Sequence, residues 1–181
     1  MNENVLLGNI ADVQTGPFGS QLHSKDYVDN GTPIVTVEHL GTRRFSVQNL
    51  PLVKDEDVKR LDRYALHEGD TVFSRVGAVD RCSYTSAAEE GWLFSGRCLR
   101  IRPKSSVNSL YLYYYLSSQS VRRYIKNIAV GATMPSINTT LVESIPVSLP
   151  SFDIQSKIAS LLSSVDDKIE LNQHTNDYLA A

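Results

Sequence analysis

Residues 145–181, IPVSLPSFDIQSKIASLLSSVDDKIELNQHTNDYLAA, decide the fold of this chain. They begin with a short β-branched run interrupted by Pro146 and Pro150, and from Phe152 onward they contain no further proline or glycine. This change of pattern predicts a strand followed by one long helix. Asp153 is the predicted N-cap, with Phe152 before it as the apolar half of a hydrophobic staple.

Apolar residues recur along this helix at steps of three and four, which places them on one stripe. Some of them fall at seven-residue steps, as a packed seam between helices requires. The expected interface comprises Ile158, Leu161, Leu162, Val165, Ile169, Asn172 and Leu179. Asn172 either fixes the register of this seam or ends the stripe. A helix from Asp153 to Ala181 would be roughly 43 Å long. We therefore expect its far end to project into solvent or to pair with a copy of itself or a second, similar half.

The composition indicates one globular domain with an appendage, since the 181 residues are 41% hydrophobic. No apolar run reaches the length of a bilayer span, and the N-terminal segment lacks the pattern of a secretion signal, so we expect a cytoplasmic protein. Cys82 and Cys98 lie far apart, with neither a CxxC pair nor clustered histidines. Buried free thiols are expected, rather than a zinc site or a disulfide.

The net charge is −2, but the charges are unevenly distributed. Residues 91–142 contain seven Lys/Arg and no Asp or Glu, whereas residues 153–177 contain five acids and two lysines. This asymmetry predicts a basic face on the globular domain and an acidic helix that binds protein. Chance clustering on a solvated surface is the alternative. Arg122, Arg123 and Lys126 are helical neighbours in the acid-free run, so they are candidates for phosphate contacts.

Short alternating runs predict strands at 32–38, 71–76, 82–85, 92–95 and 97–102, with a weaker candidate at 46–52. Helices are predicted at 55–64, 109–116, 118–127 and 139–143. Because these helices interrupt the strands in irregular order, the expected fold class is α+β. A mixed-sheet globular domain, residues 1–150, would precede a long coiled-coil-type helix, residues 151–181. The four tyrosines in residues 111–115 are expected in the core rather than in a base-stacking site.

No catalytic chemistry is indicated by the motifs. The chain has neither the phosphate-binding GxxxxGK[ST] motif nor a GxGxxG after a strand. Its two DxK matches, at residues 57–59 and 166–168, lack a convincing upstream metal carboxylate, and its four histidines stand far apart without a nucleophile motif. We therefore expect no enzymatic activity, no metal and no cofactor in this chain.

Three segments resemble the specificity (S) subunits of type I restriction–modification systems. They are GPFGSQLHSKDYVDNGTPIVTV at 16–37, GDTVFSRVG at 69–77 and GATMPSINTTLVESIPVSLPSFDIQSKIASLLSSVDDKIELN at 131–172. The sequence departs from the family pattern at residues 153–155, DIQ, where an acid usually stands directly before the glutamine. It departs again at residues 79–81, VDR, which follow Gly77 where the family often has a second glycine.

This resemblance implies a target recognition domain followed by a spacer helix, one half of a subunit that usually carries two such units. Such a module would be non-catalytic and would read one block of a bipartite target in double-stranded DNA. It would direct modification (M) and restriction (R) subunits to that target. S-adenosylmethionine is expected only on the M subunit, which would methylate adenine.

Base readout requires side chains that reach groove edges from loops, where Arg and Lys suit guanine and Gln and Asn suit adenine. The candidates are Gln21, His23, Ser24, Lys25, Arg43, Arg44, Arg75, Arg81, Thr133 and Ser136. Arg75, on a strand, is alternatively a structural ion-pair partner. The rival function is a protein-interaction module that dimerises through the helix while its basic face binds an acidic partner. A nuclease domain is a weaker rival.

Overall fold

Three small β-sheets form the framework of the computed structural model within the part of the chain that it describes, residues 3–17, 19 and 21–180. The central sheet is antiparallel, with the order β2 (Ala11–Thr15), β8 (Cys98–Pro103), β5 (Thr71–Ser74), β6 (Cys82–Tyr84). Its register pairs Val13 with Ile101 and Phe73 with Leu99.

The second sheet is mixed. Strand β3 (Thr32–Val35) pairs antiparallel with β4 (Leu52–Val53) and parallel with β7 (Leu93–Phe94). The third sheet joins the two ends of the body, since β1 (Glu3–Leu6) pairs antiparallel with β9 (Pro146–Leu149). Mixed pairing with interspersed helices confirms the predicted α+β class.

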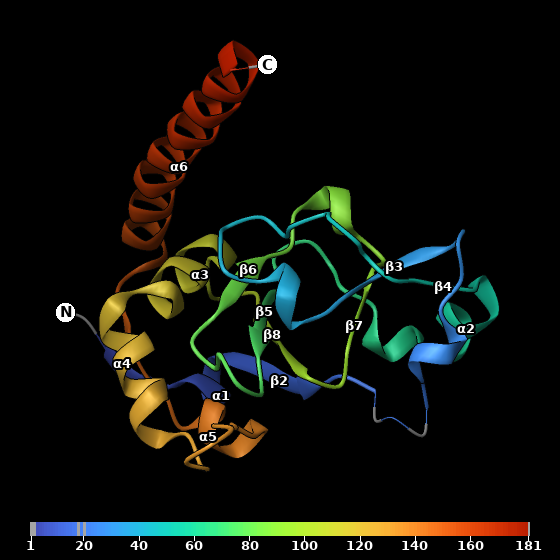
Figure 1. Ribbon diagram of the computed structural model, residues 1–181. Coiled ribbons are helices and arrows are strands. Elements are labelled where there is room, and N and C mark those ends of the chain that lie inside the picture. Colours follow the sequence, from blue (N-terminus) through green and yellow to red (C-terminus); the bar gives the residue numbers. More distant parts are fainter. Residues whose placement is uncertain (1–2, 18, 20, 181) are drawn as a thin grey trace.

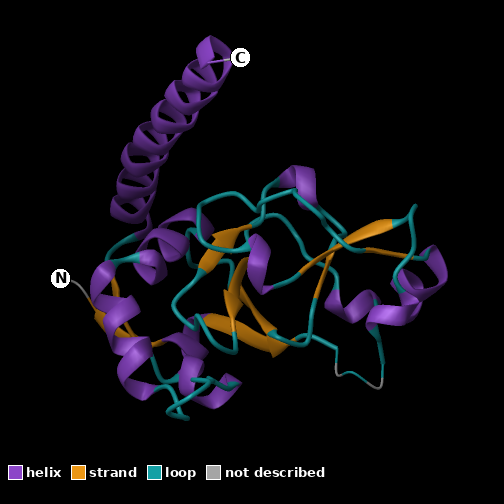
Figure 2. Ribbon diagram, viewed as in Figure 1, coloured by secondary structure: helices purple, strands orange, loops and turns teal. Residues whose placement is uncertain are grey.

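Most of the helices gather on one side of the central sheet (Figure 2). They are α1 (Leu7–Ile10), α3 (Ser109–Ser117), α4 (Gln119–Ile128) and α5 (Thr139–Glu143), whereas α2 (Asp55–Arg60) lies beside β3 and β4 at the other end of the body (Figure 1). Short 3₁₀ turns cover Ser24–Asp26, Val37–His39, Asp62–Tyr64 and Ala87–Glu89. The side chains of Asn108, Ser118 and Asn138 cap α3, α4 and α5 by accepting from backbone N–H groups.

Two hydrophobic clusters fill the body. The first packs α3, α4 and α5 on the central sheet and includes Phe73, Leu99, Leu112 and Ile125. The second lies under β3 and β7 and includes Ile34, Val35, Leu66 and Phe94. Each fully buried side chain of this size contributes about 1.5–3 kcal/mol. Of the four tyrosines predicted in the core, Tyr111 and Tyr113 are buried, and Tyr114 and Tyr115 are partly buried and pack against the first cluster.

Each cluster also contains one of the two cysteines. Cys82 and Cys98 are free and fully buried, as predicted, and burial raises the pKa of each thiol to about 12. Neither thiol is therefore accessible or ionised near neutral pH.

The last described element is α6 (Phe152–Ala180), a 29-residue helix that leaves the body beside α3 (Figure 1). Its predicted N-cap is wrong. The helix begins before Asp153, because the N–H of Gln155 already donates to the carbonyl of Ser151 at 2.9 Å. Asp153 instead stands in the first turn, where its carboxylate accepts from Lys157 Nζ at 2.8 Å and its charge complements the helix dipole. The expected last residue, Ala181, lies outside the described residues.

The predicted strands at 71–76, 82–85 and 92–95 are one or two residues shorter in the structure, and two others differ more. The run at 32–38 ends at Val35, because the backbone N–H and hydroxyl of Thr36 both contact Nδ1 of His39 at 3.0 Å and start a 3₁₀ turn. The candidate at 46–52 contributes only Leu52, which pairs with Pro33 as part of β4.

Candidate nucleic-acid interface

Arg75 connects segments that are far apart in the sequence. Its Nη1 donates to the carbonyl of Gly96 at 3.2 Å, and its backbone N–H donates to the carbonyl of Arg97 at 2.8 Å. Its own carbonyl accepts from Ile137 N–H at 2.9 Å, and nearby the N–H of Gly77 donates to the carbonyl of Pro135 at 2.8 Å. Arg75 therefore bonds to backbone carbonyls, and in the described part of the chain it forms no ion pair, so the predicted ion-pair role is wrong.

Two glycines allow the backbone at Gly16 and Pro17 to pack closely against the backbone at Ser95 and Gly96, next to Arg75. A Cβ on Gly16 would lie 2.2 Å from the carbonyl oxygen of Ser95, and one on Gly96 would lie 2.3 Å from that of Pro17. The N–H of Gly16 donates to the carbonyl of Cys98 at 3.2 Å. Only residues without a side chain allow this approach. The opening, central and closing motifs thus meet around Arg75 and Gly96.

An open cleft of about 780 Å³ lies beside this junction. Its lining includes the exposed residues Arg81, Arg97 and Glu38, with Leu22 and Tyr27 among its apolar walls. Guanidinium groups can contact phosphates or donate in pairs to guanine, and a carboxylate can accept from cytosine N4. The cleft therefore holds polar groups of the kinds that recognise nucleic acid. Arg97 had no local sequence signal beyond its place in the acid-free run.

Among the candidates of the first loop, Gln21 bonds to the body, whereas His23 and Lys25 are exposed to solvent. The Gln21 side chain accepts from Tyr64 OH at 3.0 Å, and its carbonyl accepts from Arg60 Nη2 at 2.8 Å, so Gln21 holds the loop to the body. His23 and Lys25 are exposed at the 3₁₀ turn. Ser24 belongs to the same turn, and its side chain lies outside the described residues.

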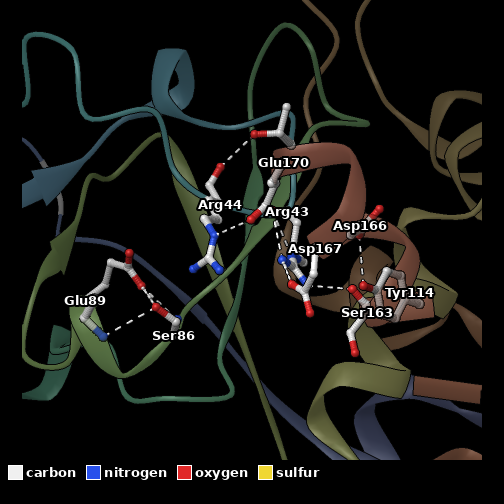
Figure 3. A network of polar contacts seen from close by, with 11 residues as sticks. Arg43, Arg44, Ser86, Glu89, Tyr114, Ser163, Asp166, Asp167 and Glu170 are labelled. Carbon is white, nitrogen blue, oxygen red and sulfur yellow. Dashed lines mark hydrogen bonds and ion pairs between the residues drawn. The ribbon is translucent and has the colours of Figure 1, made fainter. Parts of the chain in front are cut away.

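Arg43 and Arg44 lie away from the cleft and contact α6 (Figure 3). Only 10% of the Arg43 side chain is exposed, and it forms ion pairs with Asp167 and Glu170. Arg44 donates from Nε to Glu170 Oε2 at 2.8 Å. The structure therefore does not bring this pair together with Arg81.

The remaining candidates lie on α4 and on the 131–136 loop. Arg123 and Thr133 are exposed. Arg122 is half-buried and lines a second cleft, of about 400 Å³, between α3, α4 and α6. Ser136 pairs through its backbone with Val130, and its hydroxyl donates to the Val130 carbonyl at 3.3 Å.

The acid-free run does not form one continuous basic face. Arg100 is buried in the interior, where its Nη1 donates to the carbonyls of Arg63 and Ala65 at 3.2 and 3.3 Å, and burial lowers the pKa of its guanidinium. Arg102 pairs with the buried carboxylate of Asp70 at 2.7 Å. These two arginines stabilise the body, because a buried carboxylate or carbonyl requires a donor. The prediction of a single basic face is corrected accordingly.

The predicted apolar stripe of α6 is exposed to solvent. Leu161 is 67% exposed and Val165 is 50% exposed, and Ile158, Leu162, Ile169, Asn172 and Leu179 are also exposed. Among the described residues of α6, Gln155 and Ala159 are buried against the body. In the described part of the chain no helix is long and apolar enough to cross a bilayer, and no group of three or more His, Cys, Asp or Glu residues is arranged to hold a metal ion.

A mixed α+β body with a long projecting helix is the fold of solved specificity subunits. The structure matches the S subunit of a type I restriction–modification system from M. genitalium with a TM-score of 0.67 and 15% identity, over 94% of this chain and 40% of that one. It matches the HsdS subunit from Thermoanaerobacter tengcongensis with a TM-score of 0.66 and 15% identity, over 94% of this chain and 38% of that one.

Residues 2–181 match the family model of the type I restriction modification DNA specificity domain, and the chain belongs to this family. It is similar to the type I restriction enzyme MjaVIII specificity subunit of Methanocaldococcus jannaschii, with 20% identity over 98% of this chain and 42% of that subunit. It is also similar to the HindI specificity subunit of Haemophilus influenzae, with 27% identity over 68% of this chain and 28% of that subunit. The chain thus spans less than half the length of these relatives.

Proposed function

We propose that this chain is one recognition half of a type I specificity subunit, with a target recognition domain at residues 1–150 and a spacer helix at 151–181. The observation that carries the proposal is the junction at Arg75, where the three family-like segments meet beside a cleft with two exposed arginines. These segments are far apart in the sequence and lie next to one another only in the folded chain. Their meeting beside this cleft supports a shared binding role.

In this proposal the cleft faces the major groove of double-stranded DNA. Arg81 and Arg97 donate to phosphates or guanine edges, and Glu38 suits the amino group of cytosine. Exposed Lys25 and Arg123 contribute phosphate contacts that set orientation without reading sequence.

The domain itself performs no chemistry in this proposal, and it binds no cofactor. It directs M and R subunits to the target in the cytoplasm, and the M subunit supplies S-adenosylmethionine and methylates adenine. The open stripe of α6 pairs with a second recognition half or with a second copy, because an apolar surface of this length is stabilised by leaving water.

The decisive experiment measures duplex binding by the chain reconstituted with its M subunit. Selection from a random duplex library first identifies the bound sequences, and salt titration follows. A log–log slope of about −0.9 per phosphate contact is expected. Arg81→Ala and Arg97→Ala should each weaken binding to the selected target roughly tenfold or more, in line with the ~1–3 kcal/mol of a bidentate base contact.

Lys168→Ala is the matched control, because it removes one exposed positive charge from α6, away from the cleft. Its affinity should remain within about twofold of the wild type, as a distant surface charge contributes little. If no long duplex is bound at low salt, DNA recognition is refuted and the protein-interaction module becomes the better explanation. If both arginine variants bind like the wild type, the cleft is not the reading surface.

A further inference from the structure

Arg43 links the globular body to the middle of α6. Its Nε donates to Glu170 Oε1 at 3.1 Å, its Nη1 donates to the Ser163 carbonyl at 3.4 Å, and its Nη2 pairs with Asp167 and with Glu170, the latter at 2.9 Å. One guanidinium thus contacts two successive turns of the helix (Figure 3).

Two neighbours contact the same part of α6. Arg44 donates to Glu170 at 2.8 Å, and Tyr114 of α3 donates from its hydroxyl to Asp166 Oδ2 at 2.9 Å. We call this set of contacts, from Arg43, Arg44 and Tyr114 to Ser163, Asp166, Asp167 and Glu170, the helix latch. Burial and the hydrogen bond to Asp166 raise the pKa of Tyr114 to about 12, so its hydroxyl remains a donor at neutral pH.

The Arg43 side of the helix latch is anchored to the central sheet. The loop that carries Arg43 is fixed to β6, since Ser83 Oγ accepts from Gly41 N–H at 3.2 Å and donates to the Thr42 carbonyl at 2.6 Å. The N–H of Tyr84 donates to the carbonyl of Arg43 at 2.8 Å. Because Ser83 is itself fully buried in the central sheet, the guanidinium has a defined position relative to the body.

The electrostatics favour a persistent contact. Burial alone would lower the pKa of Arg43, but its hydrogen bonds to Asp167, Tyr114 and Glu170 outweigh that effect and raise it. Burial likewise acts to raise the pKa of Glu170, but hydrogen bonds from Arg44 and Arg43 lower it overall. Both charges are therefore retained at neutral pH, and the bidentate fork of arginine gives the contact a direction that a point charge lacks.

A helix held at one point can pivot, whereas a helix held at two points has a defined direction. The first point is Gln155, buried at the start of α6, where its side chain bonds to Asn108 and Pro150. The latch is the second, and it lies 8–15 residues further along, roughly 12–22 Å at helical rise. The latch lies beside the apolar stripe, since Leu162, Val165 and Ile169 line the same cleft as Arg43 and Tyr114, and these three stripe residues remain exposed.

We propose that Arg43 is a positioning residue that sets the angle between α6 and the DNA-reading cleft, and thereby the spacing of the two half-sites that a paired subunit accepts. This inference rests on the proposed function. A pivot of about 10° would move the end of a helix roughly 43 Å long by about 7 Å. That is about two base-pair steps, since one turn of ~34 Å holds about ten base pairs.

The angle can be measured directly by pulsed electron spin resonance. Spin labels are placed at Ser106→Cys on the body and Asn176→Cys on α6, both at exposed positions. Cys82 and Cys98 remain, because both are fully buried and do not react. Dilution with unlabelled protein removes distances between copies.

The wild-type chain should give one narrow distance distribution. Arg43→Ala should at least double its width, and Arg43→Lys should give an intermediate width, because lysine keeps the charge and loses the fork. Glu170→Gln removes the helix partner of Arg43 and Arg44 and should also broaden the distribution. This variant keeps the test valid if Arg43→Ala fails to fold. Lys168→Ala, on the same helix, should leave it unchanged. Wild-type widths in both Arg43→Ala and Glu170→Gln would overturn the inference.

The consequence for DNA is read by mapping the adenines methylated by the complex reconstituted with its M subunit. Glu170→Gln should leave the two half-site sequences unchanged while the accepted spacer broadens from one length to two or more. An unchanged spacer together with a broadened distance distribution would overturn the link between latch and spacing. Lost half-site recognition in Arg43→Ala but not in Glu170→Gln would show instead that Arg43 contacts DNA. A wild-type complex that recognises no DNA refutes the proposed function, and the distance measurement still tests the latch.

Discussion

Replacing Gln155 by alanine should destabilise the junction between α6 and the body. The Gln155 side chain is 2% exposed, its Oε1 accepts from the N–H of Asn108 at 2.9 Å, and its Nε2 donates to the carbonyl of Pro150 at 2.8 Å. Asn108 in turn caps α3 through its Oδ1 and donates from Nδ2 to Ser156 at 3.4 Å. One amide therefore connects the start of α6 to the start of α3.

The magnitude follows from the two groups that the substitution leaves without partners. A buried donor or acceptor that loses its hydrogen bond costs about 1–3 kcal/mol. For one N–H and one carbonyl, with partial access of water at the helix start, the total is about 3 kcal/mol. In a protein of this size, 1 kcal/mol shifts the melting temperature by roughly 2–4 °C, so Gln155→Ala should lower it by about 6–12 °C.

Urea and thermal unfolding of Gln155→Ala, Gln155→Met and Gln173→Ala measure this effect. Gln155→Met keeps most of the side-chain volume, so it separates lost hydrogen bonds from a lost contact and should remain close to the alanine variant. Gln173→Ala removes the same amide from an exposed position of the same helix and should change stability by less than about 0.5 kcal/mol. Wild-type stability in Gln155→Met would refute the reasoning.

Three further outcomes are expected. Folding lowers the pKa of Glu170 below its ordinary value of 4.5, so its stabilising effect is full above that value and is lost as pH falls through the folded pKa; the spin-label distribution should therefore broaden as the pH falls below 4.5 and remain constant between about pH 6 and 8. Gly16→Ala forces a Cβ to 2.2 Å from Ser95 and should cost more than about 2 kcal/mol in urea unfolding, whereas Gly19→Ala, which has nothing within 4 Å among the described atoms, should be neutral. Val165→Asp buries a charge in any helix pair, so it should halve the sedimentation mass if α6 dimerises, and an unchanged dimer mass would exclude a seam there.

Much of the fold was predictable because it depends on local patterns. The strands at 71–76 and 97–102 and the helices at 109–116 and 118–127 were predicted to within two or three residues at each end. The alternation of apolar residues and the capping preferences of Asn and Ser act over a few positions. The error at 32–38 arose where a side-chain contact from Thr36 to His39 ended the strand, and the error at Asp153 arose because the first backbone bond of α6, from Gln155 to Ser151, starts the helix earlier.

The candidate site was only partly predictable. Arg81 was predicted as a base-reading candidate and lines the cleft, a role in DNA binding that stays a prediction, whereas Arg97 had no local signal to distinguish it from Arg100 and Arg102 in the same run. Arg100 and Arg102 lie on β8, and Arg97 directly precedes this strand. Their separate roles depend on whether a carbonyl or a carboxylate lies within about 3 Å in the folded chain, and that distance is not a property of the local sequence.

The sequence by itself determined the long helix, its apolar stripe and the α+β class, since helix and strand periodicity express which faces must leave water. Only the tertiary structure decided that Asp166, Asp167 and Glu170 of α6 bond to the body of the same chain. It also decided that Arg43 belongs to the helix latch rather than to the cleft. Residues 43 and 170 are 127 positions apart. An ion pair depends on separation in space, and no periodicity or propensity encodes a contact between such distant residues.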